Sequence, residues 1–317
     1  MNAATDSADR RILIVGTGAL ATLFAWRLAR AGCDITLLGS WAAGLKALRT
    51  EGARLVNAPG KEQAVRVRVA ENAEACQGIP HALVLVKAWQ TAQAAHQLAR
   101  CLPSNGLALT LQNGLGNYEI LAEVLGTDRV ALGTTTAGAT LLGPGLVKPA
   151  GNGSISIQAH GRLGRLAAML ESAGFSMHPG ADAQALLWGK LVVNSAINPL
   201  TALLQVPNGE LLQRPTAKAL MRALAEETAS IAGAHHVRLG MEDPAAFVEN
   251  VAHETAGNYS SMLQDVRRGA PTEIDAISSA IVRTAQQHGL KAPLNEACWN
   301  LVSALTRSVG EPVGVAD

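Results

Sequence analysis

A glycine-containing turn near the start of the chain restricts its fold more than any other stretch. Arg11 and the apolar residues 12–15 form a short predicted strand that leads directly into Gly16-Thr-Gly-Ala-Leu-Ala21. A helical pattern follows and ends at Gly32, and a second strand is predicted over residues 34–38. A strand, a G-x-G-x-x-A turn, a helix and another strand in this order are typical of a dinucleotide-binding unit on a parallel sheet. A purely structural glycine turn is the alternative, and the surrounding pattern favours dinucleotide binding.

The small residues of this turn have physical roles in the predicted site. Gly16 permits the tight turn, Gly18 lets the backbone approach a pyrophosphate, and Ala21 lets the helix pack closely on the strand. Amide groups at the helix N-terminus attract the phosphates. We therefore predict a cofactor-binding turn formed by Gly16, Thr17, Gly18, Ala19, Leu20 and Ala21.

The end of the second strand bears on which nicotinamide cofactor is bound. An NAD site usually has an acid there and an NADP site often has an arginine nearby, but this strand runs into Gly39-Ser40-Trp41. The missing acid removes repulsion toward a 2′-phosphate. Ser40 could donate a hydrogen bond to that phosphate, and Lys46 or Arg49 could reach it. The sequence therefore favours NADP, with NAD as the alternative.

Two continuous apolar runs, residues 82–86 and 107–111, predict central parallel strands. They end in Lys87 and Asn113, and ligands of such sheets bind beyond the carboxyl ends of the strands. A solvated lysine and a plain Asn-Gly turn are the alternatives. Further strands are predicted at 65–69, at 146–147 and at 154–157, the first as an edge strand and the others as antiparallel strands closing the sheet.

From about Asp182 the pattern becomes helical. We predict an α/β fold with a Rossmann-type domain over residues 1–181 and an all-α domain over residues 182–317. Helices after the first are predicted at 216–234, 243–256, 261–268, 273–288 and 293–308, with Asp-Pro and Ala-Pro starts and glycine stops.

The first helix of this half carries Lys190, Asn194 and Asn198 at spacings of four, among apolar neighbours. On a helix they lie along one stripe, which could bind a small polar acid. A core helix whose polar groups are bonded by their neighbours is the alternative. Ser260 or Ser261 and Glu273 could likewise be helix caps or part of the same site.

Charge and cysteine usage exclude several classes. A net charge of +1 offers no basic surface for nucleic acid. The charge-free runs 130–147 and 191–209 lack the continuous apolar character of a membrane span. Four scattered cysteines, without a C-x-x-C pair or a nearby histidine cluster, predict reduced thiols in a cytoplasmic protein and no metal site.

Together, these motifs resemble those of the ketopantoate reductase (2-dehydropantoate 2-reductase) family. In the first half the resemblance lies in the turn at Gly16 to Ala21 and in Leu85-Val-Lys-Ala-Trp-Gln90, Gln112-Asn-Gly-Leu-Gly116 and Gly133-Thr-Thr-Thr136. In the second half it lies in Leu187-Trp-Gly-Lys-Leu-Val-Val-Asn-Ser-Ala-Ile-Asn-Pro-Leu-Thr201, Pro207-Asn-Gly-Glu-Leu211, Ser260-Ser-Met-Leu-Gln-Asp265 and Thr272-Glu-Ile-Asp275.

The resemblance implies reduction of 2-dehydropantoate to pantoate with NADPH, on the way to pantothenate and coenzyme A. The sequence does not fix the oligomeric state, and both a monomer and a homodimer stay open. It implies Lys190 as the catalytic acid and Glu273 as its partner near the cofactor ribose. It also implies that the substrate is held by Asn113, Asn194, Asn198, Asn208, Asn258 and Ser261. The cofactor site would be lined by Lys87, Asn113, Ala139 and Glu273. The family's arginine for the 2′-phosphate falls near Ser40 here, and this departure keeps both NADP and NAD open.

Two other functions are compatible with the motifs. One is a related NAD(P)-dependent reductase of another small 2-keto acid. The other, of a different class, is a non-catalytic NADP-binding sensor. A sensor has no need of the Lys–Asn–Asn stripe or of Glu273, so the sequence favours an enzyme.

Overall fold

The structure is a computed structural model and describes residues 10–57, 60–151, 153–180 and 182–306. The described residues divide into two compact units. The first comprises residues 10–112 and 116–183, and the second comprises residues 113–115 and 184–306. The α/β half followed by an all-helical half, as predicted from the sequence, is confirmed.

Among the described residues, the first unit is built on an eight-stranded sheet with the order β12-β11-β8-β7-β6-β1-β2-β5. Its strands are β1 (Arg11–Val15), β2 (Asp34–Leu38), β5 (Arg68–Ala70), β6 (His81–Val84), β7 (Leu107–Thr110), β8 (Val130–Thr135), β11 (Ser154–Ile157) and β12 (Ser176–Pro179). The pairings are parallel except that of β11 with β8. The chain moves from β1 outward to β2 and β5, and then returns to add β6 on the other side. The strand order therefore reverses beside β1, which is where open α/β sheets bind their ligands.

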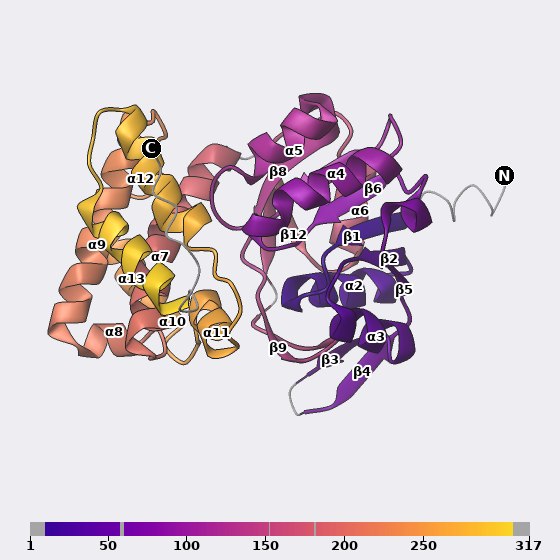
Figure 1. Ribbon diagram of the computed structural model, residues 1–317, viewed down its shortest axis with the longest axis horizontal. Coiled ribbons are helices and arrows are strands. Elements are labelled where there is room, and N and C mark those ends of the chain that lie inside the picture. The colour runs from indigo at the N-terminus through magenta and orange to yellow at the C-terminus, as the bar shows by residue number, and fades with distance from the viewer. Residues whose placement is uncertain (1–9, 58–59, 152, 181, 307–317) are drawn as a thin grey trace. The chain divides into compact units, whose positions relative to one another are not determined.

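Helices cover both faces of this sheet (Figure 1). They are α2 (Ala19–Arg30), α3 (Ala42–Thr50), α4 (Thr91–Cys101), α5 (Asn117–Leu125) and α6 (Gly164–Ser172), with short 3-10 turns η1 (Ala73–Cys76), η2 (Ala88–Gln90) and η3 (Thr127–Arg129). Ile12 and Ile14 of β1 pack in one core with α2 and α6, while Leu13 packs in a second core with α4 and α5. Alternate residues of the strand thus point to opposite faces, and burial on both faces explains the continuous apolar runs.

A second, four-stranded sheet lies within the described part of the first unit, in the order β4-β3-β10-β9. Its strands are β3 (Ala53–Val56), β4 (Glu62–Val65), β9 (Ala139–Gly143) and β10 (Leu146–Pro149). Two predictions were wrong here. The single edge strand expected at 65–69 is divided, because Val65 ends β4 while Arg68 begins β5 of the larger sheet. The strand expected at 146–147 pairs with β3 and β9, and so belongs to the small sheet. An alternating pattern specifies an extended chain but not its partner strand.

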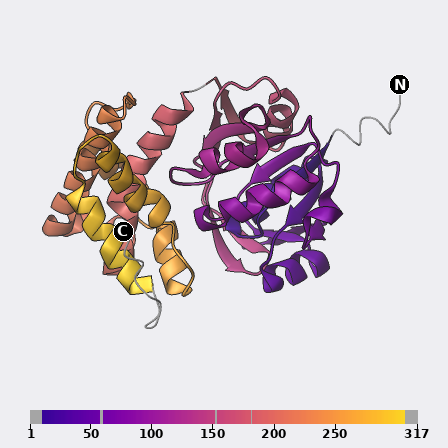
Figure 2. The ribbon, with the colours of Figure 1, turned by 45° about the horizontal axis from the view of Figure 1, so that its top comes forward.

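The second unit consists of helices and their connecting loops in the part of the chain that the structure describes (Figure 2). Its helices are α7 (Ala183–Leu204), α8 (Glu210–Gln213), α9 (Pro215–Ala234), α10 (Pro244–Glu254), α11 (Ser261–Arg267), a π-helical turn η4 (Asp275–Ser279), α12 (Ala280–Gln287) and α13 (Pro293–Thr306). Residues 307 and 308 of the helix expected at 293–308 lie outside the described residues. No helix in the described part of the chain combines the length and apolarity needed to cross a bilayer.

Local capping explains where several of these helices begin. The Asp243 side chain accepts a hydrogen bond from the Ala246 backbone amide (2.9 Å), and Pro244 occupies the first turn of α10. Ser260, rather than Ser261, caps α11 by accepting from the Leu263 amide (3.1 Å). These starts are encoded within a few residues of sequence, which is why the helices were predictable.

Candidate active site

The glycine-containing turn of the first unit connects β1 to α2. Gly16 has a φ of +129°, and a Cβ at this position would lie 3.0 Å from the Leu85 carbonyl oxygen. Its amide donates to the Leu38 carbonyl (2.8 Å). A side chain here would be strained by the backbone conformation and by the neighbouring strand. Gly16 therefore holds the turn against the strands on either side of β1.

Gly18 is exposed at the N-terminus of α2, and its environment fits a dinucleotide phosphate. It has an ordinary φ of −82°, and a Cβ placed there would meet nothing within 4 Å. Within the described ranges no side chain caps this helix end, and the first turn of α2 carries no acid. The backbone amides and the positive end of the helix dipole thus face open space that an anion can occupy. The turn predicted from the sequence therefore presents an uncapped helix N-terminus with free space beside Gly18.

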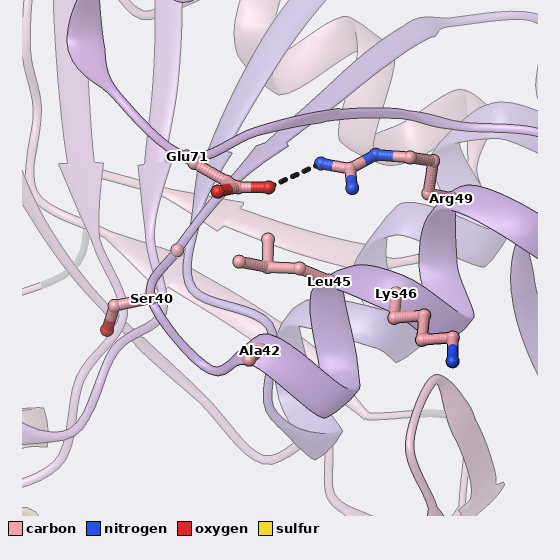
Figure 3. A pocket seen from close by; sticks show the side chains of 7 residues that line it. Ser40, Ala42, Leu45, Lys46, Arg49 and Glu71 are labelled. Carbon is pink, nitrogen blue, oxygen red and sulfur yellow. Dashed lines mark hydrogen bonds and ion pairs between the residues drawn. The ribbon is translucent and has the colours of Figure 1, made fainter.

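A cavity of about 320 Å³ lies beyond the carboxyl end of β2 (Figure 3). It is lined by Gly39, Ser40, Ala42, Leu45, Lys46, Arg49 and Glu71. Ser40 is exposed, while Arg49 of α3 forms an ion pair with Glu71 (Nη2 to Oε1 2.7 Å). This is the end of the sheet at which the adenine ribose of a dinucleotide binds in Rossmann-type folds.

Buried polar side chains tie together the loops that follow β6 and β7. Gln112 donates through Nε2 to the Val86 carbonyl (3.0 Å) and to Thr91 Oγ1 (2.8 Å). It accepts through Oε1 from Thr110 Oγ1 (3.0 Å). Thr91 in turn donates to Asn117 Oδ1 (2.7 Å). Each group in the chain of bonds has a partner, so the arrangement is rigid.

This network holds the residues directly before Lys87 and Asn113. Lys87 is half-buried at the start of η2, where its carbonyl accepts from the Gln90 amide (2.8 Å). The sequence analysis did not identify Gln112 as a positioning residue. Thr91 and Asn117 are 26 residues apart, and no local pattern relates them. Ala139, the other residue expected near the cofactor, begins β9, which packs against α2.

In the second unit, Lys190 of α7 is half-buried and Glu273 is buried. Desolvation lowers the pKa of Lys190 to about 8, and the negative charge of Glu273 opposes that shift. Asn113 Nδ2 donates to Glu273 Oε2 (3.3 Å). The structure therefore brings together three predicted site residues that are far apart in the chain.

Gly114 explains how Asn113 reaches this cluster. Its φ is +83°, and an added Cβ would lie 2.4 Å from the Ala276 carbonyl oxygen. The next amide, of Leu115, donates to that same oxygen (3.0 Å). The loop therefore lies directly on η4, a π-helical turn of a kind common at functional sites. Only glycine permits this approach, and the Asn-Gly pair in the sequence is its local signature.

The polar stripe of α7 continues to a second cluster. Asn194 is half-buried and Asn198 is 7% exposed. One turn further on, Thr201 Oγ1 bonds to the Asn198 carbonyl (3.0 Å) and to Ser260 Oγ (2.7 Å). The stripe therefore ends against the segment that leads into α11, where Ser261 is exposed.

Asn208 and Asn258 meet beside this segment. The Asn208 amide donates to the Asn258 carbonyl (3.0 Å), and Asn208 Nδ2 donates to Thr255 Oγ1 (2.9 Å). Thr255 donates to the Val251 carbonyl (2.6 Å). Asn208 Oδ1 is buried and accepts no hydrogen bond from the residues that the structure describes.

Comparison with known proteins places this geometry in a family. The ketopantoate reductase PanE/ApbA family matches residues 12–162, and its C-terminal counterpart matches residues 182–306. A 2-dehydropantoate 2-reductase of Halobacterium salinarum is 34% identical over 302 residues, covering 94% of this chain and 99% of that protein. This chain belongs to the ketopantoate reductase family. The family resemblance inferred from the sequence motifs is thereby confirmed.

A further relative and two solved structures extend the comparison. The 2-dehydropantoate 2-reductase of Archaeoglobus fulgidus is 35% identical, covering 92% of this chain and 97% of that protein. A crystal structure of a PanE/ApbA family ketopantoate reductase from Ralstonia eutropha JMP134 superposes with a TM-score of 0.87 at 31% identity, covering 93% of this chain and 98% of the other. D-mandelate dehydrogenase, solved with NADH and anilino(oxo)acetate, superposes with the same TM-score of 0.87 at 27% identity and the same coverage.

Proposed function

We propose that this member of the ketopantoate reductase family reduces 2-dehydropantoate to pantoate with a nicotinamide dinucleotide, and that NADPH is favoured over NADH. One observation carries the proposal: an amine with a lowered pKa, Lys190, interacts electrostatically with buried Glu273, which Asn113 also contacts. A reductase of a keto acid needs such a proton donor. The relatives named 2-dehydropantoate 2-reductase support the substrate.

The two units contribute different binding groups to this proposal. The turn from Gly16 to Ala21 would hold the pyrophosphate, with Ser40 near the adenine ribose and with Lys87 and Ala139 lining the remainder. Asn113, Asn194, Asn198, Asn208, Asn258 and Ser261 would bind the carboxylate and hydroxyl groups of the substrate. The missing acid after β2 supports NADP, because a carboxylate directly at that position would repel a 2′-phosphate.

Bound nicotinamide cofactor would supply the hydride for the ketone carbon. The ammonium group of Lys190 would stabilise the negative charge that grows on the ketone oxygen and donate a proton to it. With a pKa of about 8, this amine is about 90% protonated at pH 7, yet it releases its proton more readily than an ordinary lysine. Glu273 would orient Lys190, and its negative charge would partly offset the fall in the pKa of Lys190 caused by desolvation. Asn113 would hold the Glu273 carboxylate.

The direct test is oxidation of NADPH and NADH, side by side, with 2-dehydropantoate as substrate. We expect turnover with both wild-type protein and Lys218→Ala, a variant of a surface lysine paired with Glu249. Lys190→Ala should lower kcat at least about a hundredfold, the usual contribution of a general acid. Unchanged kcat in Lys190→Ala would remove this residue from the mechanism.

The structural similarity to D-mandelate dehydrogenase favours one second candidate, an NADH-dependent reductase of a different small 2-keto acid. A panel of 2-keto acids with branched, aromatic and hydroxylated side chains separates the two functions. Preference for 2-dehydropantoate by kcat/KM supports the first, and preference for an aromatic keto acid supports the second. Cofactor binding without oxidation by any of these acids would indicate a non-catalytic sensor instead.

A further inference from the structure

The cavity beyond β2 contains an acid that the local sequence does not reveal. Strands β2 and β5 are parallel, with Leu38 opposite Ala70, and the Gly39 amide donates to the Ala70 carbonyl (3.3 Å). Glu71 therefore follows β5 at the level where Gly39 follows β2. Strand β2 itself ends without the acid that an NAD site usually has there, but Glu71 places a carboxylate in the same cavity from the neighbouring strand.

The same cavity also contains the cation that an NADP site requires. Arg49 extends from α3 toward Glu71 across the rim, while the side chain of Lys46 extends away from Ser40 (Figure 3). The side chains of Arg49 and Glu71 are 54% and 60% exposed. An ion pair this exposed is weak and costs little to open. Either partner is therefore available to a ligand that enters the cavity.

The two cofactor forms make opposite demands on this pair. The 2′-hydroxyl of NADH can donate a hydrogen bond to a carboxylate. The 2′-phosphate of NADPH is an anion, which a guanidinium binds in a bidentate manner. The carboxylate of Glu71 would repel the 2′-phosphate, and the guanidinium of Arg49 offers no acceptor to the 2′-hydroxyl. Ser40 carries no charge and distinguishes the two forms little.

We propose that the Arg49–Glu71 ion pair determines the preference of this protein between NADPH and NADH. Glu71 accepts the ribose 2′-hydroxyl of NADH, and Arg49 leaves Glu71 to bind the 2′-phosphate of NADPH. Since each group is held by the other before the cofactor binds, the protein uses both cofactors with a modest preference. The inference rests on the proposed function only in requiring that a nicotinamide dinucleotide binds in the first unit.

Equilibrium titration of the full chain with NADPH and with NADH, followed by nucleotide fluorescence without substrate, tests the proposal. Arg49→Gln should weaken NADPH by about tenfold or more and leave NADH nearly unchanged, as expected for loss of a charge-assisted hydrogen bond. Glu71→Gln should shift the ratio of the two Kd values in the opposite direction, by weakening NADH and strengthening NADPH. Arg68→Gln is the matched control, because Arg68 forms an exposed ion pair with Asp34 on the same sheet but does not line the cavity.

The outcomes separate this proposal from the proposed function. Opposite shifts of the Kd ratio in Arg49→Gln and Glu71→Gln support the role of the Arg49–Glu71 pair even if 2-dehydropantoate is not reduced. If both variants bind the two nucleotides with the wild-type Kd ratio, the proposed role of the Arg49–Glu71 pair is wrong, and the proposed reductase function is unaffected. A loss of NADPH affinity in Lys46→Gln but not in Arg49→Gln would also overturn it, by assigning the phosphate to Lys46. If wild-type protein binds neither nucleotide, both proposals fail.

Discussion

The pH dependence of catalysis offers the sharpest test of the Lys190–Glu273 cluster. The proposed proton donor is the ammonium form of Lys190, whose pKa is lowered from 10.5 to about 8 by desolvation and held up by the charge of Glu273. In the wild type, kcat/KM should therefore be level below pH 8 and fall above it. Glu273→Gln removes the charge but retains an oxygen that can accept from Asn113. The pKa of Lys190 should fall further in this variant, so the decline should begin at a lower pH.

The size of the effect follows from the two protonation curves. A nearby opposite charge shifts a pKa by about 1 to 3 units, and the smallest such shift would lower the pKa of Lys190 from about 8 to about 7. The ratio of wild-type to variant kcat/KM would then include a factor near one at pH 6, about fivefold at pH 8 and about tenfold at pH 9. Any loss of substrate orientation adds a constant factor at every pH, so the change with pH isolates the effect on Lys190.

The assay is initial-rate oxidation of the cofactor at subsaturating 2-dehydropantoate, in buffers of constant ionic strength from pH 6 to pH 9.5. Glu249→Gln serves as the control, because Glu249 pairs with Arg222 and Lys218 rather than with the cluster, and its profile should match the wild type. If kcat/KM falls over the same pH range in the wild type and in Glu273→Gln, the electrostatic coupling is refuted, whatever the absolute loss of rate. An unchanged rate above pH 8 in the wild type would remove the Lys190 proton from the rate equation.

Substitutions at four further positions test other parts of the site. Asn198→Ala should raise KM for 2-dehydropantoate more than KM for NADPH, and the reverse would mean that the α7 stripe faces the cofactor. Gly18→Ala should leave the melting temperature unchanged, since its Cβ meets open space, but should weaken cofactor binding by about tenfold through loss of phosphate contacts. Gly16→Ala should instead lower the melting temperature, and equal melting curves for the two variants would contradict these roles. Thr255→Val should remove the acceptor of the Asn208 side-chain Nδ2, and so raise KM for the keto acid with little change in kcat. Thr255→Ser keeps the hydroxyl and should have a KM near that of the wild type; equal rises in KM in both variants would show that Thr255 acts only in packing.

Much of the fold was predictable because its signals are local. The first strand, turn, helix and second strand appear at the residues expected from the glycine pattern and apolar runs. Asp243-Pro244 and Ala292-Pro293 correctly mark helix starts. The pairing of strands was less predictable. The alternating residues 65–69 predicted one strand, yet they contribute to two sheets, because alternation describes the chain's own conformation and carries no information on its neighbour.

Residues of the candidate site divide in the same way. The spacing of Lys190, Asn194 and Asn198 placed them on one helix, and α7 runs through all three. The sequence named Ser260 or Ser261 as a possible cap, and the structure shows that Ser260 caps α11. The contact of Asn113 with Glu273 joins residues 160 positions apart and could be anticipated only from the family resemblance.

Sequence alone determined which stretches are helices and strands, where glycine is required and which polar residue types are available, because caps, turns and apolar periodicity act over a few residues. Only the tertiary structure decided that Glu71 of one strand stands beside the end of another, with Arg49 across the cavity from it. It alone also decided that Lys190 is desolvated near a buried carboxylate. Charge interaction and desolvation depend on distance and packing in space, and distant parts of the chain acquire both only on folding.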